Sequence, residues 1–157
     1  MPFGWYSLNT YATPRRGQVT MIYGPAGSCK SMMALNYVLH AGKPTLYVSP
    51  DTDQHDTALR CVEIRQNINS DAAEKGIAVG AIDLAAELQD FRDWLWFAFD
   101  PAPTVDDLDL ELMAFEEQFG VPPEILVVDT LSDVHAADED EYRGYRRTMA
   151  ALHIFAR

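Results

Sequence analysis

The stretch GPAGSCKS, Gly24 to Ser31, decides the fold of this 157-residue chain. It follows a short apolar, β-prone run, Val19 to Tyr23, and leads into a helical segment, Ser31 to His40. A glycine-containing loop that ends in Lys-Ser between a buried strand and a helix is typical of phosphate-binding loops. Its glycines let backbone N–H groups curl around phosphate oxygens, and the start of the helix adds partial positive charge. The pattern therefore predicts a nucleotide site at this turn.

The residues of this loop have separate expected roles. Lys30 is expected to reach the β- and γ-phosphates of ATP, and the Ser31 hydroxyl to bind Mg²⁺. The loop departs from the pattern G-x-x-x-x-G-K-[ST] at Cys29, where a side chain stands in place of a glycine that permits close approach. An ordinary strand-to-helix turn is the alternative interpretation. The expected nucleotide-binding residues are Gly24, Pro25, Ala26, Gly27, Ser28, Cys29, Lys30, Ser31 and Met32.

A second motif, ILVVD at Ile125 to Asp129, supplies a carboxylate at the end of a buried strand. In phosphate-loop enzymes, a carboxylate in this place holds Mg²⁺, usually through water. The motif is weak alone, because many buried strands end in Asp. It gains weight here because it follows the loop in the expected order. We therefore expect Ser31 and Asp129 to bind the metal ion together.

Asp51 follows another short strand, Thr45 to Ser49, and two interpretations of it remain open. Its carboxylate is placed to orient and deprotonate an attacking water, as a general base does. Alternatively, it caps the helix that follows, a role that Thr52 and Asp53 suit equally well. With Asp51 as the base, the predicted catalytic residues are Lys30, Asp51 and Asp129.

The rest of the chain alternates strands with helices. A further strand is expected at Leu95–Phe99, and helices at His55–Asn67, within Ser70–Asp93, from Thr104 to Gly120 and at Asp140–Ala156. Thr104 and Asp107 match a capping box, which marks a helix start. The alternation predicts an α/β fold, a three-layer sandwich with a mostly parallel sheet covered on both faces. Ligands of such sheets bind beyond the carboxyl ends of the strands, where Gly24, Asp51 and Asp129 are expected to lie.

Composition and charge narrow the class of protein. The chain is 48% hydrophobic and 11% aromatic, as a folded single domain requires. It contains no membrane-length apolar run, and we expect no signal peptide, because Met1 to Thr20 lacks a basic region followed by an apolar stretch. Its two cysteines are too few for a disulfide framework or a metal site. We therefore expect a cytoplasmic protein with no membrane partner. The net charge of −12 argues that any contact with single-stranded DNA is local, or comes from an oligomer or a missing segment.

Three segments, PRRGQVTMIYGPAGSCKS from Pro14, LYVSPDTD from Leu46 and ILVVDTLSD from Ile125, resemble the RecA-like P-loop ATPases. That family includes recombinases and DnaB-type replicative helicases, and the chain looks most like small bacteriophage members described as helicase-like or DNA-repair ATPases. In the family's terms, Gly24 to Ser31 is the Walker A motif and Asp129 ends Walker B. Asp51 falls on the position of the catalytic Glu.

The resemblance implies a Mg²⁺-dependent ATP hydrolase in DNA replication, recombination or repair, a homo-oligomer in the cytoplasm of a bacterium or a phage-infected host. It also implies that residues 1–157 are a single RecA-like domain, incomplete at its C-terminus, since the family continues into a strand that bears a sensor residue. Two alternatives stay open. One is a regulator or assembly module that binds nucleotide without hydrolysing it. The other is a small-molecule kinase, although no arginine-rich lid is evident.

Overall fold

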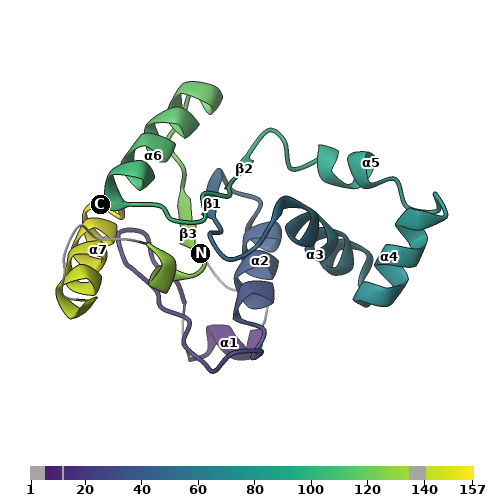
Figure 1. The fold of residues 1–157 in the computed structure, drawn as a ribbon, viewed down its shortest axis with the longest axis horizontal. Helices are drawn as coiled ribbons and strands as arrows, with labels where there is room; N and C mark the ends of the chain where they lie inside the picture. The colour runs from purple at the N-terminus through teal and green to yellow at the C-terminus, as the bar shows by residue number, and fades with distance from the viewer. Residues whose placement is uncertain (1–5, 12, 135–140) are drawn as a thin grey trace.

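The computed structural model describes residues 6–11, 13–134 and 141–157. Its described sheet has three strands, β1 (Thr45–Val48), β2 (Leu95–Ala98) and β3 (Ile125–Val128). They are parallel and lie in the order β2-β1-β3, so β1 is the central strand (Figure 1). The register sets Tyr47 beside Phe97 on one side and beside Val127 on the other. The expected parallel α/β arrangement is therefore present, and the carboxyl ends of all three strands share one edge.

Helices occupy the connections where the sequence predicts them, and the weakly patterned region from Ser70 to Asp93 forms two short ones. A 3₁₀ turn, η1 (Leu131–Asp133), follows β3. Asp140, where the last helix was expected to begin, lies outside the described residues. No helix in the described ranges is long and apolar enough to cross a membrane. The α-helices are α1 (Tyr6–Asn9), α2 (Lys30–Ala41), α3 (Gln54–Gln66), α4 (Ser70–Ala78), α5 (Leu84–Gln89), α6 (Val105–Phe119) and α7 (Glu141–Phe155).

One face of the sheet packs against α6 and α7. Leu46 and Val48 point to this face, because alternate residues of a strand face the same way. They meet Leu108 and Phe115, which are fully buried on the apolar side of α6, and α7 adds Leu152 to the same cluster. These apolar residues therefore attach α6 to the face of the sheet beside which it lies in Figure 1.

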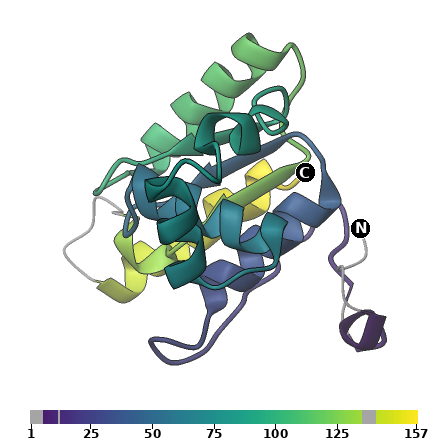
Figure 2. The same cartoon turned by 90° about the vertical axis from the view of Figure 1, so that its right-hand side faces the viewer.

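The opposite face packs against α2 and α3. Tyr47 points there, among Leu35 and Val38 of α2 and Cys61 of α3. Burial raises the pKa of the Cys61 thiol to about 12, so this cysteine behaves as a small apolar side chain. A separate cluster attaches α4 and α5 to α3, and these helices extend to one side of the sheet in Figure 1, whereas Figure 2 shows α1 apart from the sheet.

One predicted strand does not form. The run Val19 to Tyr23 joins no strand of the described sheet, and the side chains of Met21 and Tyr23 are 60% and 93% exposed. A β-prone run becomes a strand only where a neighbouring strand offers it backbone partners and packing. This run pairs with neither edge strand, β2 or β3. The prediction of a fourth strand before the loop was therefore wrong, although the helix after the loop was predicted correctly.

The capping box of α6 gives a direct test of the fold. Thr104 Oγ1 accepts from the Asp107 backbone N–H at 3.2 Å, and Asp107 accepts from the Thr104 N–H at 2.8 Å. Thr104→Ala should lower the free energy of unfolding by about 1 kcal/mol, because the Asp107 N–H loses the side-chain oxygen that caps it. Thr104→Ser keeps the oxygen and should lose much less. Urea denaturation measures both, and equal losses would attribute the effect to the methyl group instead.

Candidate functional site

The loop Gly24 to Ser31 curls tightly before α2. Gly27 has φ +75°, a conformation that residues with a side chain rarely adopt. A Cβ at Gly24 would lie 2.7 Å from the Ser28 hydroxyl oxygen, so a side chain at this position would force that hydroxyl to move. The residues from Pro25 to Cys29 are exposed, whereas Lys30, Ser31 and Met32 are partly buried in the first turn of α2. The tip of the loop is therefore open to a ligand, and its base is fixed by the helix.

Cys29 is the N-cap of α2 and has a left-handed backbone, with φ 60° and ψ 30°. Its side chain makes no capping hydrogen bond, and the thiol is exposed. The left-handed conformation costs a residue with a Cβ about 1–2 kcal/mol. The structure therefore gives a conformational reason for glycine at this position of the pattern, whereas the sequence suggested only a limit on close approach.

Lys30 lies across the loop that precedes it. Its Nζ donates to the carbonyl oxygen of Gly24 at 3.0 Å and to that of Pro25 at 2.9 Å. An ammonium group has three N–H donors, so two contacts to the loop leave it able to donate to a further acceptor. The charge is held at the loop, as a role in phosphate binding requires.

The two predicted metal ligands lie together in the structure. Ser31, in the first turn of α2, donates from Oγ to Oδ1 of Asp129 at 3.1 Å, although 98 positions separate them in the sequence. Asp129 follows β3 directly, and its N–H donates to the carbonyl of Val48 at 2.9 Å, which continues the pairing with β1. A hydroxyl and a carboxylate are the hard oxygen donors that Mg²⁺ prefers, so the pair fits this ion.

Tyr47 is a site residue that the sequence reasoning missed. Its hydroxyl donates to the other carboxylate oxygen of Asp129, Oδ2, at 2.8 Å, and its side chain is only 3% exposed. Burial, the Asp129 charge and this hydrogen bond together raise the pKa of Tyr47, so the hydroxyl stays protonated. The register contained the signal: Tyr47 pairs with Val127, and Asp129 lies two residues further on the same face.

Asp51 and Asp53 have different roles in the structure. Asp53 is the N-cap of α3, and its side chain accepts from the Asp56 N–H at 2.8 Å. Asp51 lies before it in the turn after β1 and is exposed. Because β1 and β3 are parallel, Asp51 and Asp129 leave the sheet at the same edge. The capping role therefore belongs to Asp53, and the Asp51 carboxylate stays available for another one.

Arg60 is a second residue near the site that the sequence reasoning missed. It lies on α3 and donates from Nη1 to Thr52 Oγ1, in the turn after β1, at 3.4 Å. Its positive charge acts to lower the pKa of Tyr47, against the larger effects that raise it. A cation thus stands near the edge of the sheet where Asp51 and Asp129 emerge, although an arginine within a helix belongs to no recognisable motif.

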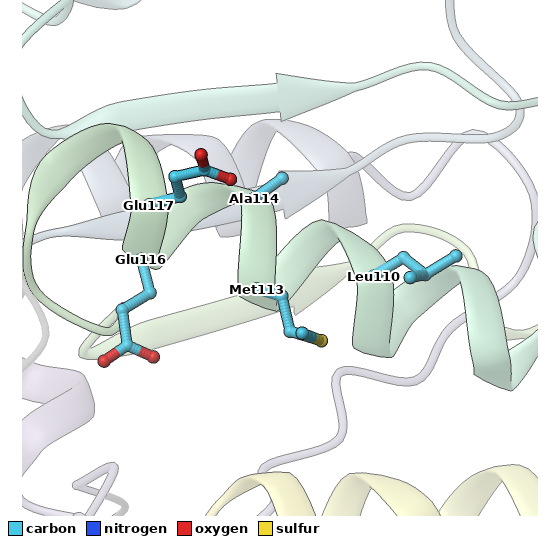
Figure 3. A pocket seen from close by; sticks show the side chains of 5 residues that line it. All are labelled: Leu110, Met113, Ala114, Glu116 and Glu117. Atoms are coloured by element: carbon cyan, nitrogen blue, oxygen red, sulfur yellow. The ribbon is translucent and has the colours of Figure 1, made fainter.

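A shallow hollow on α6 is separate from these residues. Leu110, Met113, Ala114, Glu116 and Glu117 line it, all from one helix (Figure 3). Leu110 and Met113 are 62% and 63% exposed. None of the predicted site residues lines this hollow, so the candidate site is the loop before α2 together with the residues after β1 and β3.

Comparison with known proteins agrees with this geometry. A family described as an AAA domain matches residues 13–157. The Gene 65 protein of Mycobacterium phage L5 is 27% identical over 163 residues, which cover 100% of this chain and 60% of that protein. The Gene 65 protein of Mycobacterium phage D29 is 27% identical over 144 residues, covering 88% and 61%. The chain thus spans about three-fifths of the length of these relatives. Since the family match includes nearly every residue, the chain belongs to the AAA domain family of P-loop ATPases.

Proposed function

We propose that this chain is the ATP-binding domain of a Mg²⁺-dependent ATPase of the RecA-like class. The contact between Ser31 and Asp129 carries the proposal, because two motifs 98 positions apart meet at 3.1 Å. Membership of the AAA domain family supports an ATPase-type function. We further propose that residues 1–157 are one domain of the three-layer type, since helices cover both faces of the described sheet.

Each residue of the site has a role in this proposal. The stretch from Gly24 to Met32 holds ATP, with Lys30 on the β- and γ-phosphates. Ser31 and Asp129 hold Mg²⁺, which supplies positive charge where negative charge develops on the phosphates. Asp51 orients the attacking water and takes its proton. The proposal uses side chains that leave the sheet at one edge or belong to the loop before α2.

We propose a role in DNA replication, recombination or repair in the cytoplasm of a phage-infected cell. The resemblance to RecA-like ATPases and the phage origin of both relatives support it. The net charge of −12 disfavours a single domain that grips nucleic acid by itself. Single-stranded DNA would therefore be bound by a homo-oligomer, or by parts of a longer protein, since the relatives extend beyond the matched region.

A second candidate is a module that binds ATP without hydrolysing it. The exposure of Asp51 favours this alternative, because a general base works best when it is held against its water. The two functions share the loop and the metal pair, and they differ only in whether phosphate is released.

Lys30→Ala tests nucleotide binding. A hydrogen bond to a charged group is worth about 1.5–3 kcal/mol, so the loss of the ammonium should weaken ATP binding by roughly ten- to a hundredfold. Ser31→Ala should weaken binding only when Mg²⁺ is present. Titration with a fluorescent ATP analogue measures both. Lys43→Ala is the matched control, since Lys43 lies beyond the far end of α2 near Glu124. Unchanged affinity in Lys30→Ala would exclude the proposed site.

Cys29→Gly tests the conformation of the loop. Glycine adopts a left-handed backbone without the penalty of a Cβ, so the free energy of unfolding should rise by about 1 kcal/mol. Cys29→Ala keeps the Cβ and should bring no such gain. Thermal denaturation compares the two variants with the wild type, and ATP titration checks that binding is kept. A gain of the same size in both variants would attribute the effect to the exposed thiol rather than to the backbone.

Asp51→Asn separates hydrolysis from binding. The variant should bind ATP normally, because a base contacts the water and not the phosphates, while phosphate release falls by about 10²–10⁴-fold. Asp53→Asn removes the same charge two residues away but keeps the oxygen that caps α3, so it should have little effect. Phosphate release is measured with and without single-stranded DNA. Equal activity in Asp51→Asn and the wild type would assign the base to another residue. No release from the wild type would favour the non-hydrolysing module.

A further inference from the structure

We propose that Tyr47 is the positioning residue of the metal site: its hydroxyl holds one oxygen of Asp129 so that the other oxygen faces Ser31. The inference rests on the proposed function, because it assigns the Ser31–Asp129 pair to Mg²⁺. It adds a residue that belongs to neither the loop nor the motif at the end of β3. Tyr47 comes from the central strand, and it acts on the metal only through Asp129.

The carboxylate of Asp129 is held through both of its oxygens. Tyr47 Oη donates to Oδ2 at 2.8 Å, and Ser31 Oγ donates to Oδ1 at 3.1 Å. The backbone is fixed as well, because the Asp129 N–H donates to the carbonyl of Val48 at 2.9 Å. A carboxylate held on one oxygen cannot rotate freely about its last torsion. Oδ1 is therefore the oxygen that a metal ion beside Ser31 would meet.

The ring of Tyr47 is itself firmly placed. It is almost fully buried and lies with its centroid 5.4 Å from that of Phe97, at an angle of 48°. Leu35 and Val38 of α2 belong to the same core cluster. The helix that carries Ser31 and the strand that precedes Asp129 therefore both pack in the cluster that contains this ring. Tyr47 thus lies between the two elements that carry the ligands, and its hydroxyl orients one of them.

The packing and the hydroxyl make separable contributions. A phenylalanine at this position would keep the contact with Phe97 and the burial against α2, since it differs only by the hydroxyl. The hydrogen bond to Asp129 is what the hydroxyl adds to that packing. Loss of a partner that orients a metal ligand commonly costs 10–100-fold in metal affinity. A role in packing alone predicts no such change.

Tyr47→Phe is the decisive variant, and the readout is binding rather than turnover. A fluorescent ATP analogue is titrated in EDTA and then at increasing Mg²⁺ concentration. Binding in EDTA should stay within about twofold of the wild type, while the Mg²⁺ concentration for half-maximal enhancement rises about tenfold. Phe97→Leu is the matched control, because it disturbs the ring packing and leaves the hydroxyl. It should lower the melting temperature and leave the Mg²⁺ dependence unchanged.

A second variant distinguishes a specific effect on Asp129 from a general effect on folding. Asp129→Asn should remove most of the Mg²⁺ enhancement, and Tyr47→Phe added to it should change the Mg²⁺ dependence no further, because the two residues act as one unit. Equal Mg²⁺ dependence in Tyr47→Phe and the wild type would overturn the role of Tyr47 alone. The same loss in Tyr47→Phe and Phe97→Leu would also overturn it, because the Mg²⁺ dependence would then respond to any change in this part of the core. A wild type that binds the analogue equally with and without Mg²⁺ would instead overturn the proposed function.

Discussion

The carboxylate of Asp129 joins the two halves of the site. A partly buried carboxylate is stable only when donors satisfy it, and here the donors come from two different elements. Ser31 belongs to the helix after the loop, and Tyr47 to the central strand. One charged group therefore connects α2, and the loop before it, to the central strand of the sheet. The rest of the site depends on this link, because Lys30 and the loop are continuous with the same helix.

The alternation of side chains along the strands decides which face carries the chemistry. The side chains of Leu46 and Val48 face α6 and α7 and contribute only packing. Tyr47 faces α2, and Asp129 shares this face because it lies two residues beyond Val127. A shift of one residue in the pairing of β1 with β3 would place Tyr47 and Asp129 on opposite faces. The register of the sheet is therefore as important for the site as the residues of the two motifs.

The sequence predicts the elements well wherever a local pattern determines them. The helix after the loop, the capped helix from Thr104 and the strands before Asp51 and Asp129 all lie where expected. The strand before Asp51 is buried as predicted, whereas the strand before Asp129 is only partly buried. The predicted strand at Val19–Tyr23 failed, because strand formation depends on a partner that composition does not reveal.

The site shows the same division between local and long-range information. The loop motif and the acid after β3 are visible in the sequence because spacing and order define them. Tyr47 is not, since its role arises from the pairing of two strands whose register has to be known first. The left-handed backbone of Cys29 is also hidden, because the sequence shows a missing glycine but not the conformation that requires it. Asp53 caps α3, but Asp51, Thr52 and Asp53 all suit this role in the sequence, so the sequence does not show which of them is the cap.

The hydrogen bonds that the loop already makes also determine how tightly a ligand can bind. Lys30 already donates to two loop carbonyls, and Ser31 already donates to Asp129. A nucleotide at this site would therefore exchange existing hydrogen bonds for new ones, and its affinity measures the difference between them. Two features favour this exchange. The exposed tip of the loop gives up few contacts within the protein when a ligand binds, and the start of α2 carries partial positive charge. Tyr47 takes no part in the exchange, because it holds the carboxylate oxygen that does not face Ser31. Lys30 and Ser31 thus change hydrogen-bond partners when a nucleotide binds, and Tyr47 keeps Asp129 in place during the change.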